Sequence, residues 1–306
     1  MFSFITKLAM FRADAMLKDL TDGRNVLHEG EGSGSLVNDR ELKADTEIGQ
    51  AVSKVFLEDS RFKYAVVEGG TPNCVFNFKA KDSYVVGIDP IDGSLAYEKA
   101  RLTAGAPYSL VVTIARARNG EDILFKDIVA SLVYDFRVNG YWIRQPNKDG
   151  TVGHTMVRSS LRGMLKKAIP DKSKTVDLGK QFVVFESYYP QTRDIAFKAF
   201  EGEKGYLRSF CSAAWEMAMV SSGDFSAQFC LSQKNHELGA AYNLVTGAGG
   251  SVINAMSGES IADEVWMKWT GKLGKQYDWN IQTPVIVACN EAYGKEVYKK
   301  IKPYVG

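Results

Sequence analysis

One short segment constrains the fold of this 306-residue chain more than any other. The apolar run 84–88 (YVVGI) leads directly into the segment 89–94 (DPIDGS). The β-branched residues of the run predict a buried strand, and the Asp-Pro and Asp-Gly pairs predict a turn directly after it. On such a turn the carboxylates of Asp89 and Asp92 can converge on one side. The fold must therefore carry two acidic side chains at the end of a buried strand.

This pair of carboxylates has both a chemical and a purely structural interpretation. Magnesium prefers hard oxygen ligands in octahedral geometry, so two carboxylates and a backbone carbonyl suit it. Gly93 and Ser94 follow at a point where a helix can begin, and the N–H groups of a helix start favour a phosphate. A plain turn without any ligand would use the same residues. Taken alone, the segment leaves both interpretations open.

Both halves of the chain are predicted to mix strands and helices. Strands are predicted over 64–67, 84–88, 108–116, 127–134, 181–187, 226–231, 251–255 and 284–289, and a hairpin at Asn139-Gly140. Helices are predicted over 47–57, 191–200, 212–222 and 291–302, and from about Glu237 to Gly249. This order favours an α+β fold over a doubly wound parallel sheet. The irregular segment 144–178 is the natural boundary, which divides the chain into halves 1–145 and 146–306.

Composition argues against several classes of function. The formal net charge of +2 gives no electrostatic reason to expect a nucleic-acid or membrane partner. No segment approaches the ~20 apolar residues of a membrane span, and charged residues interrupt the apolar N-terminus, where an amphipathic helix is expected instead of a signal peptide. We therefore expect a cytoplasmic protein. The cysteines are too widely spaced for a zinc site and are predicted to be small buried residues in a reducing compartment: Cys74, Cys211, Cys230 and Cys289.

Several motifs together resemble the inositol monophosphatase family of magnesium-dependent, lithium-sensitive sugar-phosphate phosphatases. The segment 89–94 matches the family's first motif, and Glu68 follows an apolar strand where the family has a metal-binding glutamate. Residues 208–250 follow the frame of the second motif, from an Arg-Ser pair to an Ala-Gly-Gly end. The pair Ala44-Asp45 resembles the family's third-metal aspartate. The resemblance extends over roughly residues 40–302.

The resemblance implies a layered α-β-α-β-α sandwich and a metal-dependent phosphoric monoester hydrolase that forms a homodimer. It implies about two or three Mg²⁺ ions, with Mn²⁺ as a substitute, and metal ligands at Glu68, Asp89, the Ile91 carbonyl, Asp92 and Glu237. It gives catalytic roles to Asp45, Ser94 and Glu68, and phosphate contacts to Gly93, Ser94, Ser212 and Ala213. Inositol monophosphate, fructose-1,6-bisphosphate or a related sugar phosphate would be hydrolysed by direct transfer to water.

Some of these residues also have ordinary structural interpretations. Asp45 could be a first-turn acid of its helix, Glu68 a strand-end surface carboxylate, and Ser94 a helix cap. Gly30 to Gly34 could form a mobile loop near the metals.

Two departures from the family pattern bear on metal geometry and substrate choice. The chain has His236-Glu237 where the family has Trp-Asp, and His236 could recognise phosphate, bind metal or cap a helix. Cys230 stands where the family has a carboxylate that contacts the substrate. A 3'(2'),5'-bisphosphate nucleotidase is a separate alternative, since the aromatic and basic segment 265–279 could stack on a base. A non-catalytic member of the fold that binds a phosphorylated ligand or a protein is another.

Overall fold

The computed structural model describes residues 43–68, 74–77, 84–94, 96–97, 107–118, 120–138, 140–147, 149–158, 165–168, 182–203, 205–272 and 275–305. The expected N-terminal helix and the expected loop over 30–34 lie outside these residues.

The N-terminal part of the chain forms an eight-stranded sheet in the order β2-β1-β3-β4-β6-β7-β8-β9. Its strands are β1 (Phe62–Val67), β2 (Cys74–Phe76), β3 (Tyr84–Asp92), β4 (Ser109–Arg116), β6 (Ile128–Asp135), β7 (Gly140–Arg144), β8 (Met156–Arg158) and β9 (Leu165–Lys167). The pair β1 and β3 is parallel, and the other neighbours are antiparallel. The expected hairpin is confirmed, since β6 and β7 pair as antiparallel neighbours, but Gly140 already belongs to β7 and pairs with Asp135. The most central strands read as continuous apolar runs because both faces of this sheet are covered.

The C-terminal part forms a five-stranded sheet in the order β11-β10-β12-β16-β13. Its strands are β10 (Phe182–Phe185), β11 (Tyr206–Arg208), β12 (Ala227–Lys234), β13 (Ser251–Asn254) and β16 (Gln282–Ala288). A small third sheet joins β5 (Ile123–Leu124), β14 (Val265–Lys272) and β15 (Lys275–Asp278). The aromatic segment 265–279 is thus a pair of antiparallel strands.

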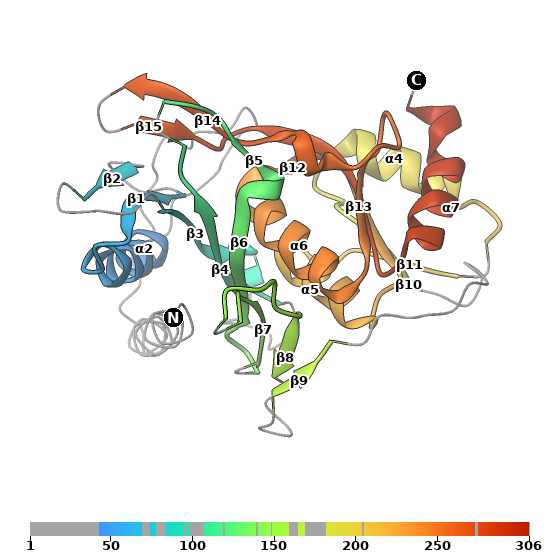
Figure 1. Cartoon of the computed structure of the whole chain (residues 1–306). Coiled ribbons are helices and arrows are strands. Elements are labelled where there is room, and N and C mark those ends of the chain that lie inside the picture. Colours follow the sequence, from blue (N-terminus) through green and yellow to red (C-terminus); the bar gives the residue numbers. More distant parts are fainter. Residues whose placement is uncertain are drawn as a thin grey trace.

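Helices cover both sheets and separate them, which gives five layers (Figure 1). Helix α2 (Lys43–Leu57) lies on the outer face of the larger sheet, and α5 (Ala213–Ser222) and α6 (Asn235–Ala248) lie between the two sheets. Helices α4 (Pro190–Ala199) and α7 (Glu291–Ile301) cover the outer face of the smaller sheet. The predicted α+β class and the α-β-α-β-α arrangement are both confirmed.

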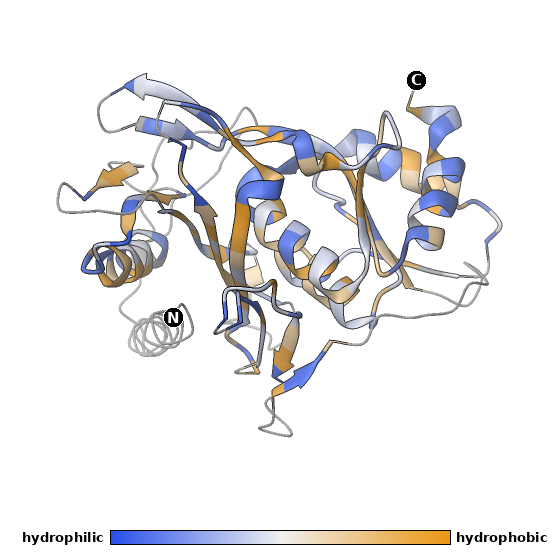
Figure 2. Cartoon of the chain, in the orientation of Figure 1, coloured by the Kyte–Doolittle hydropathy of each residue, from blue (hydrophilic) through white to orange (hydrophobic). Residues whose placement is uncertain are grey.

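Apolar periodicity explains why these helices dock where they do. In α2 the side chains of Ile48, Val52 and Phe56 are fully buried against the larger sheet, and each contributes about 1.5–3 kcal/mol relative to exposure. Figure 2 shows the apolar colour following the inner strands and the polar colour on the outward face of α7. Helix α6 ends at Gly249, whose φ of 95° is the left-handed conformation that glycine adopts at helix ends.

Strand β3 continues further than the sequence predicts, and this difference positions the two aspartates. The turn expected at Asp89 is instead a bulge within the strand, since β3 ends at Asp92. Asp89 pairs with Val111 of β4 and Asp92 pairs with Ser109, so four residues of β3 face three of β4. Residues three apart in a regular strand point to opposite faces. The extra residue of the bulge turns both carboxylates toward α5 and α6.

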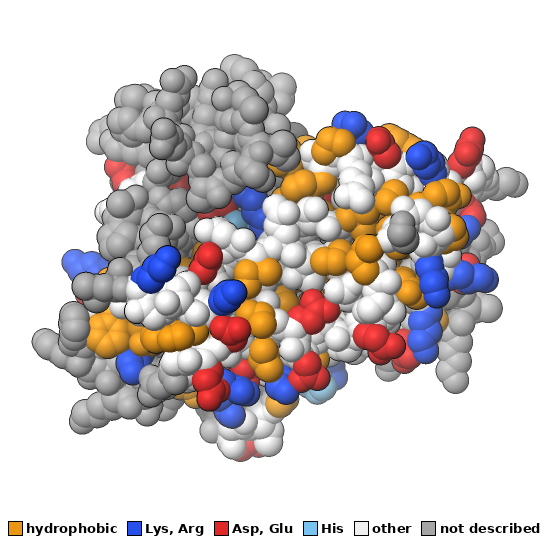
Figure 3. All heavy atoms as spheres, turned by 90° about the horizontal axis from the view of Figure 1, so that it is seen from above, with side chains coloured by type: hydrophobic (Ala, Val, Ile, Leu, Met, Phe, Trp, Pro, Cys, Tyr) orange, Lys and Arg blue, Asp and Glu red, His pale blue; other side chains and the backbone are white. Residues whose placement is uncertain are grey.

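Other expectations have mixed outcomes. Cys74, Cys230 and Cys289 are buried as predicted, but Cys211 is exposed, because it lies in the turn before α5 and not in a strand or helix. Acidic, basic and apolar side chains are interspersed on the face seen in Figure 3. Within the described ranges, no helix combines the length and the apolar character needed to cross a membrane. The division at residue 145 stays a prediction.

Candidate metal and phosphate site

Three carboxylates from two distant segments meet between the larger sheet and α6. Asp89 and Asp92 come from β3, and Glu237 lies in the first turn of α6. Each of the three offers an oxygen, and these oxygens lie within 4.8 Å of one another. The two aspartates are almost fully buried, at 2% and 4% exposure.

Glu68 joins this group from the neighbouring strand. The parallel register pairs Val67 of β1 with Ile88 of β3, and the Glu68 N–H donates to the Ile88 carbonyl over 2.9 Å. Glu68 and Asp89 each come one residue later and so lie side by side on the face toward α6. The register of this parallel strand pair therefore brings together two acidic side chains that are far apart in the sequence.

Asp92 is held by hydrogen bonds from β4 and from the start of α5. Its Oδ2 accepts from the Ser212 hydroxyl at 2.6 Å, from the Ala214 N–H at 3.0 Å and from the Ser109 hydroxyl at 3.2 Å. Burial and the nearby charge of Glu237 raise the pKa of Asp92 to about 7, although the bonds from Ser212 and Ala214 lower it. Asp92 is therefore fixed in orientation and surrounded by negative charge.

Asp89, unlike Asp92, has a buried carboxylate oxygen that no neighbouring group in the described part of the chain hydrogen-bonds. Its Oδ2 is buried without a hydrogen-bond partner among the described residues. Burial, followed by the charges of Glu68 and Asp92, raises the pKa of Asp89 well above its ordinary value. Buried carboxylates in this state are stabilised by a cation or by a proton. A divalent cation would satisfy the orphaned oxygen and neutralise the repulsion together.

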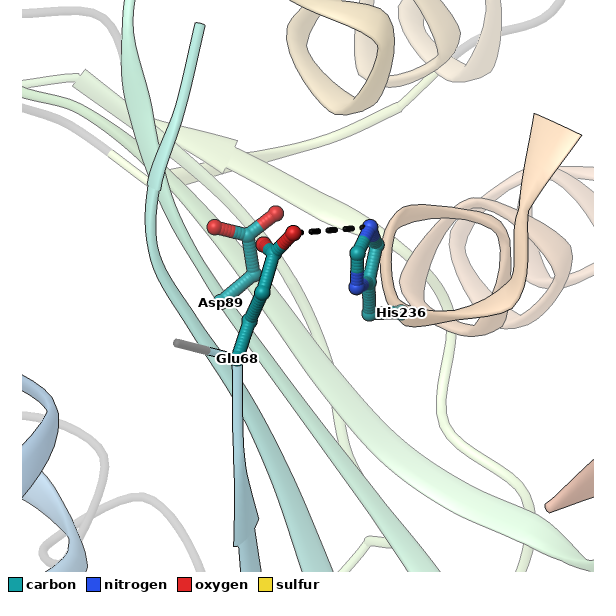
Figure 4. A group of neighbouring side chains, drawn as sticks. All are labelled: Glu68, Asp89 and His236. Atoms are coloured by element: carbon teal, nitrogen blue, oxygen red, sulfur yellow. Dashed lines mark ion pairs between the residues drawn. The ribbon is translucent and has the colours of Figure 1, made fainter. Parts of the chain in front are cut away.

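Two basic side chains approach the cluster from the end of β12 and the start of α6. Lys234 Nζ lies 3.5 Å from Glu68 Oε1. His236 Nε2 lies 3.4 Å from the same oxygen, an ion pair drawn as the dashed line in Figure 4. Burial raises the pKa of Glu68, but the charges of His236 and Lys234 together hold it below its ordinary value. Burial lowers the pKa of His236, but the neighbouring carboxylates raise it overall. The carboxylates therefore favour positive charge on the side chains beside Glu68.

The remaining predicted residues surround this cluster. Asp45 lies in the first turn of α2, and its charge adds to the rise in the pKa of Asp89. The side chain of Ile91 is 4% exposed within the bulge of β3. A helical turn begins after β3, because the Tyr97 N–H donates to the Gly93 carbonyl over 2.9 Å. This turn includes Ser94, as the sequence predicts.

Gly93 is required by the close approach of two chain segments. Its φ is 86°, and a Cβ placed there would lie 3.0 Å from the Cys211 carbonyl oxygen and 3.1 Å from Ser212 Cβ. The turn after β3 therefore packs directly against the start of α5. Helix α5 begins at Ala213, with Ser212 as its N-cap residue. The first N–H groups of a helix have no intrahelical acceptor and carry partial positive charge, although the Ala214 N–H is directed to Asp92.

Sequence reasoning missed several residues that shape the site. Ser109 bridges Asp92 and Ser212, Gln233 donates from its Nε2 to Glu237 Oε2, and Lys234 approaches Glu68. A lone serine in a strand and a lysine at a strand end carry no distinctive spacing. Glu186, at the end of β10, is 8% exposed, and burial raises its pKa to about 7.

The structure places two features that bear on substrate choice, Cys230 and the segment 265–279. Cys230 is fully buried, with its Sγ 3.4 Å from the Ser232 N–H. In the segment 265–279, Trp266, Tyr277 and Trp279 are at most 3% exposed and belong to the main core cluster. These three rings pack in the interior, so they are not available to stack on a nucleotide base.

Known structures match this chain over nearly all of its length. SuhB from Bartonella henselae matches with a TM-score of 0.70 and 14% identity, covering 98% of each chain. A protein described as an IMPase/NADP phosphatase complexed with Mg²⁺ and phosphate matches with a TM-score of 0.64 and 14% identity, covering 95% of this chain and 91% of that one. A 2'AMP-bound SaIMPase-II matches with a TM-score of 0.65 and 14% identity, over 99% and 95%. No protein-family model and no curated protein matches the sequence.

Proposed function

We propose that this chain, which shares the fold of the inositol monophosphatases, is a divalent-cation-dependent phosphomonoesterase. Its substrate would be a small phosphate ester such as inositol monophosphate, fructose-1,6-bisphosphate or a related sugar phosphate. The observation that carries the proposal is the convergence of Asp89, Asp92 and Glu237 within 4.8 Å, beside the start of α5. Without cations, so many buried carboxylates would repel one another.

The donor set fits Mg²⁺ or Mn²⁺, because it consists mainly of hard carboxylate oxygens and includes the orphaned Oδ2 of Asp89. In this proposal Glu68, Asp89, the Ile91 carbonyl, Asp92 and Glu237 hold the cations. Bound cations acidify water at neutral pH and neutralise charge on a phosphate ester.

The chain's own residues would orient the reactants. Ser212, Ser109 and the Ala214 N–H hold the Asp92 carboxylate in one position, so that its position would not change during turnover. The helix starts at Ser94 and Ala213 would bind phosphoryl oxygens with Gly93 and Ser212. Asp45 and Ser94 would orient a water molecule from the α2 side, with Glu68 beside them.

A cation-dependent assay of phosphate release tests this function. The panel contains inositol 1-phosphate, fructose-1,6-bisphosphate, 2'-AMP and a 3',5'-bisphosphate nucleotide, each with MgCl₂, with MnCl₂ or with EDTA. We expect cation-dependent release from at least one substrate and none in EDTA. Asp89→Asn should lower kcat/KM by about 10³-fold or more, whereas Asp194→Asn on the exposed side of α4 should leave it unchanged.

The panel also separates the alternatives. Turnover of the bisphosphate nucleotide alone would identify a nucleotidase. An absence of turnover on every substrate with both cations would refute the phosphatase and favour a non-catalytic protein that binds a phosphorylated ligand. The homodimer and the cytoplasmic location stay predictions that this assay does not address.

A further inference from the structure

The imidazole of His236 is buried beside the carboxylates of Glu68 and Glu237, which its Nε2 approaches without a hydrogen bond of standard geometry. The residue is 1% exposed in the first turn of α6, and its ring projects toward Glu68 (Figure 4). Neither Nδ1 nor Nε2 makes a hydrogen bond with any residue that the structure describes. Unpaired buried polar nitrogens are costly, and such an exception calls for a ligand or a function.

A capping role does not account for this histidine. The N-cap residue of α6 is Lys234, and no side chain caps the helix. The start of α6 is anchored instead by Asn235, whose Nδ2 donates to the Val265 carbonyl at 2.9 Å and to the Trp266 carbonyl at 3.0 Å. His236 is therefore not needed to hold the helix in place.

The position of the Nε2 atom is that of a potential metal ligand. It lies 3.4 Å from Glu68 Oε1 and 3.6 Å from Glu237 Oε1. His236, Glu68 and Asp89 each offer a ligand atom within 4.8 Å of the other two. The Asp89 Oδ2 is also unpartnered among the described residues. Two atoms without hydrogen bonds to any described residue and the Glu68 carboxylate thus lie close together.

The ring is also restrained in orientation. Trp279, itself 3% exposed, packs edge to face against the imidazole with ring centroids 5.5 Å apart and an interplanar angle of 89°. The backbone of His236 is fixed by α6 and by the Asn235 anchor. A ligand that is already oriented loses little conformational entropy when it binds a metal.

We infer that His236 Nε2 is a direct ligand of a first-row transition ion such as Mn²⁺, held together with Glu68 and Asp89. This inference rests on the proposed function and names the class of cation that the Glu68 side of the site prefers. Imidazole nitrogen suits first-row transition ions, whereas Mg²⁺ selects oxygen ligands. The mixed nitrogen and oxygen set favours Mn²⁺ over Mg²⁺ at this position.

Pulsed electron paramagnetic resonance of the full chain loaded with Mn²⁺ tests the ligand directly. Wild-type protein should show nitrogen-14 modulation from a bound imidazole, which His236→Gln should abolish. His154→Gln is the matched control, since His154 lies exposed in the loop before β8, and it should keep the modulation. By calorimetry, His236→Gln should weaken Mn²⁺ binding by about 10-fold or more and Mg²⁺ binding by less than about 3-fold.

Each contrary result overturns the inference. These results are absent nitrogen modulation in the wild type, modulation that survives in His236→Gln, an equal loss of Mn²⁺ and Mg²⁺ affinity, or no Mn²⁺ binding at all. The wild-type spectrum decides the matter even if the variant fails to fold. Turnover on the phosphate-ester panel without nitrogen modulation would reject only the histidine ligand, and modulation without turnover would reject only the phosphatase.

Discussion

The two sides of the candidate site are built in different ways. On one side, Glu68 and the two aspartates of β3 belong to a strand pair, and β3 pairs with β1 and β4. On the other side, His236 and Glu237 lie in the first turn of α6. The strand side carries Glu68, Asp89 and Asp92, which match the family pattern, and the helix side carries the departure His236-Glu237.

The difference follows from what fixes each backbone. A strand paired on both edges is fixed by its backbone hydrogen bonds, and the pairing register determines on which face of the sheet each side chain lies. The start of α6 is fixed mainly at Asn235. Its side chain bonds to two carbonyls of β14 and accepts from the Thr283 hydroxyl, its N–H donates to the Ile281 carbonyl, and its carbonyl accepts from the Trp266 Nε1. Because that anchor is separate from His236 and Glu237, these two positions can change their chemistry while the helix stays in place.

The largest predicted effect contrasts one acidic residue from each side. Asp92→Asn should lower kcat/KM by about 10³-fold, because it removes negative charge from a carboxylate held in one orientation. Glu237→Asp should change kcat/KM by less than about 10-fold, because it only shortens a side chain at the start of a helix. Steady-state kinetics with saturating Mn²⁺ measures both. Equal losses would contradict the division into a rigid side and an adaptable one.

The next effect concerns the anchor of α6. Asn235→Ala would leave the Val265 and Trp266 carbonyls and the Thr283 hydroxyl without these bonds, so the free energy of unfolding should fall by about 3 kcal/mol. Urea denaturation measures this change, and Asn280→Ala, at an exposed position, is the control. Metal affinity should fall as well, since the two proposed ligands His236 and Glu237 would lose their fixed position. A stable variant with normal affinity would show that other contacts hold the helix.

A pH-dependent effect is expected from Glu186, which lies at the end of β10. The pKa of Glu186 is about 7 in the folded protein, above its ordinary value of 4.5, chiefly because of burial. The protonated side chain of Glu186 therefore contributes its full share to the free energy of unfolding below pH 4.5. That contribution is lost as the pH rises through 7, because the buried side chain must then ionise. Between pH 4.5 and pH 8, Glu186→Gln should gain at most about 3 kcal/mol relative to wild type. Urea denaturation in EDTA measures the difference, and parallel pH profiles would contradict the burial argument.

The smallest effect concerns the turn before α5. Cys211 has a φ of 65°, and among the described residues it alone adopts a positive φ without being a glycine. Cys211→Gly should raise the free energy of unfolding by about 0.5–1 kcal/mol, since it relieves this conformation at some cost in chain entropy. Cys211→Ala keeps the strain and should give no gain. A gain in both variants would place the strain in the thiol and not in the backbone.

The sequence predicted the strands and acidic residues of the strand side, but not the side chains that hold them or the anchor of the helix side. Apolar runs that end in Glu68 and Asp89 predict both strands, because burial on two faces leaves a continuous apolar pattern. A local sequence pattern does not show which distant residues a side chain will contact. The hydrogen bond from Ser109 to Asp92 and the bond from Asn235 to β14 join positions 17 and 30 or more residues apart.

The sequence also did not predict one unusual backbone conformation, that of Cys211. Cysteine is an unusual residue for a left-handed backbone, so no local pattern predicted the conformation of Cys211. The aromatic segment 265–279 shows the same limit in another form. Its tryptophans and lysines are compatible with an exposed binding surface, and only the packing of β14 and β15 places Trp266 and Trp279 in the core.

The bulge in β3 makes the site depend on how many residues separate two aspartates. With the extra residue, Asp89 and Asp92 share a face; without it, one of them would turn toward α2 and its apolar cluster. Loss of a single codon between them would therefore invert a side chain, while most substitutions at Pro90 or Ile91 would not. Insertions and deletions here should therefore be tolerated far less than point changes.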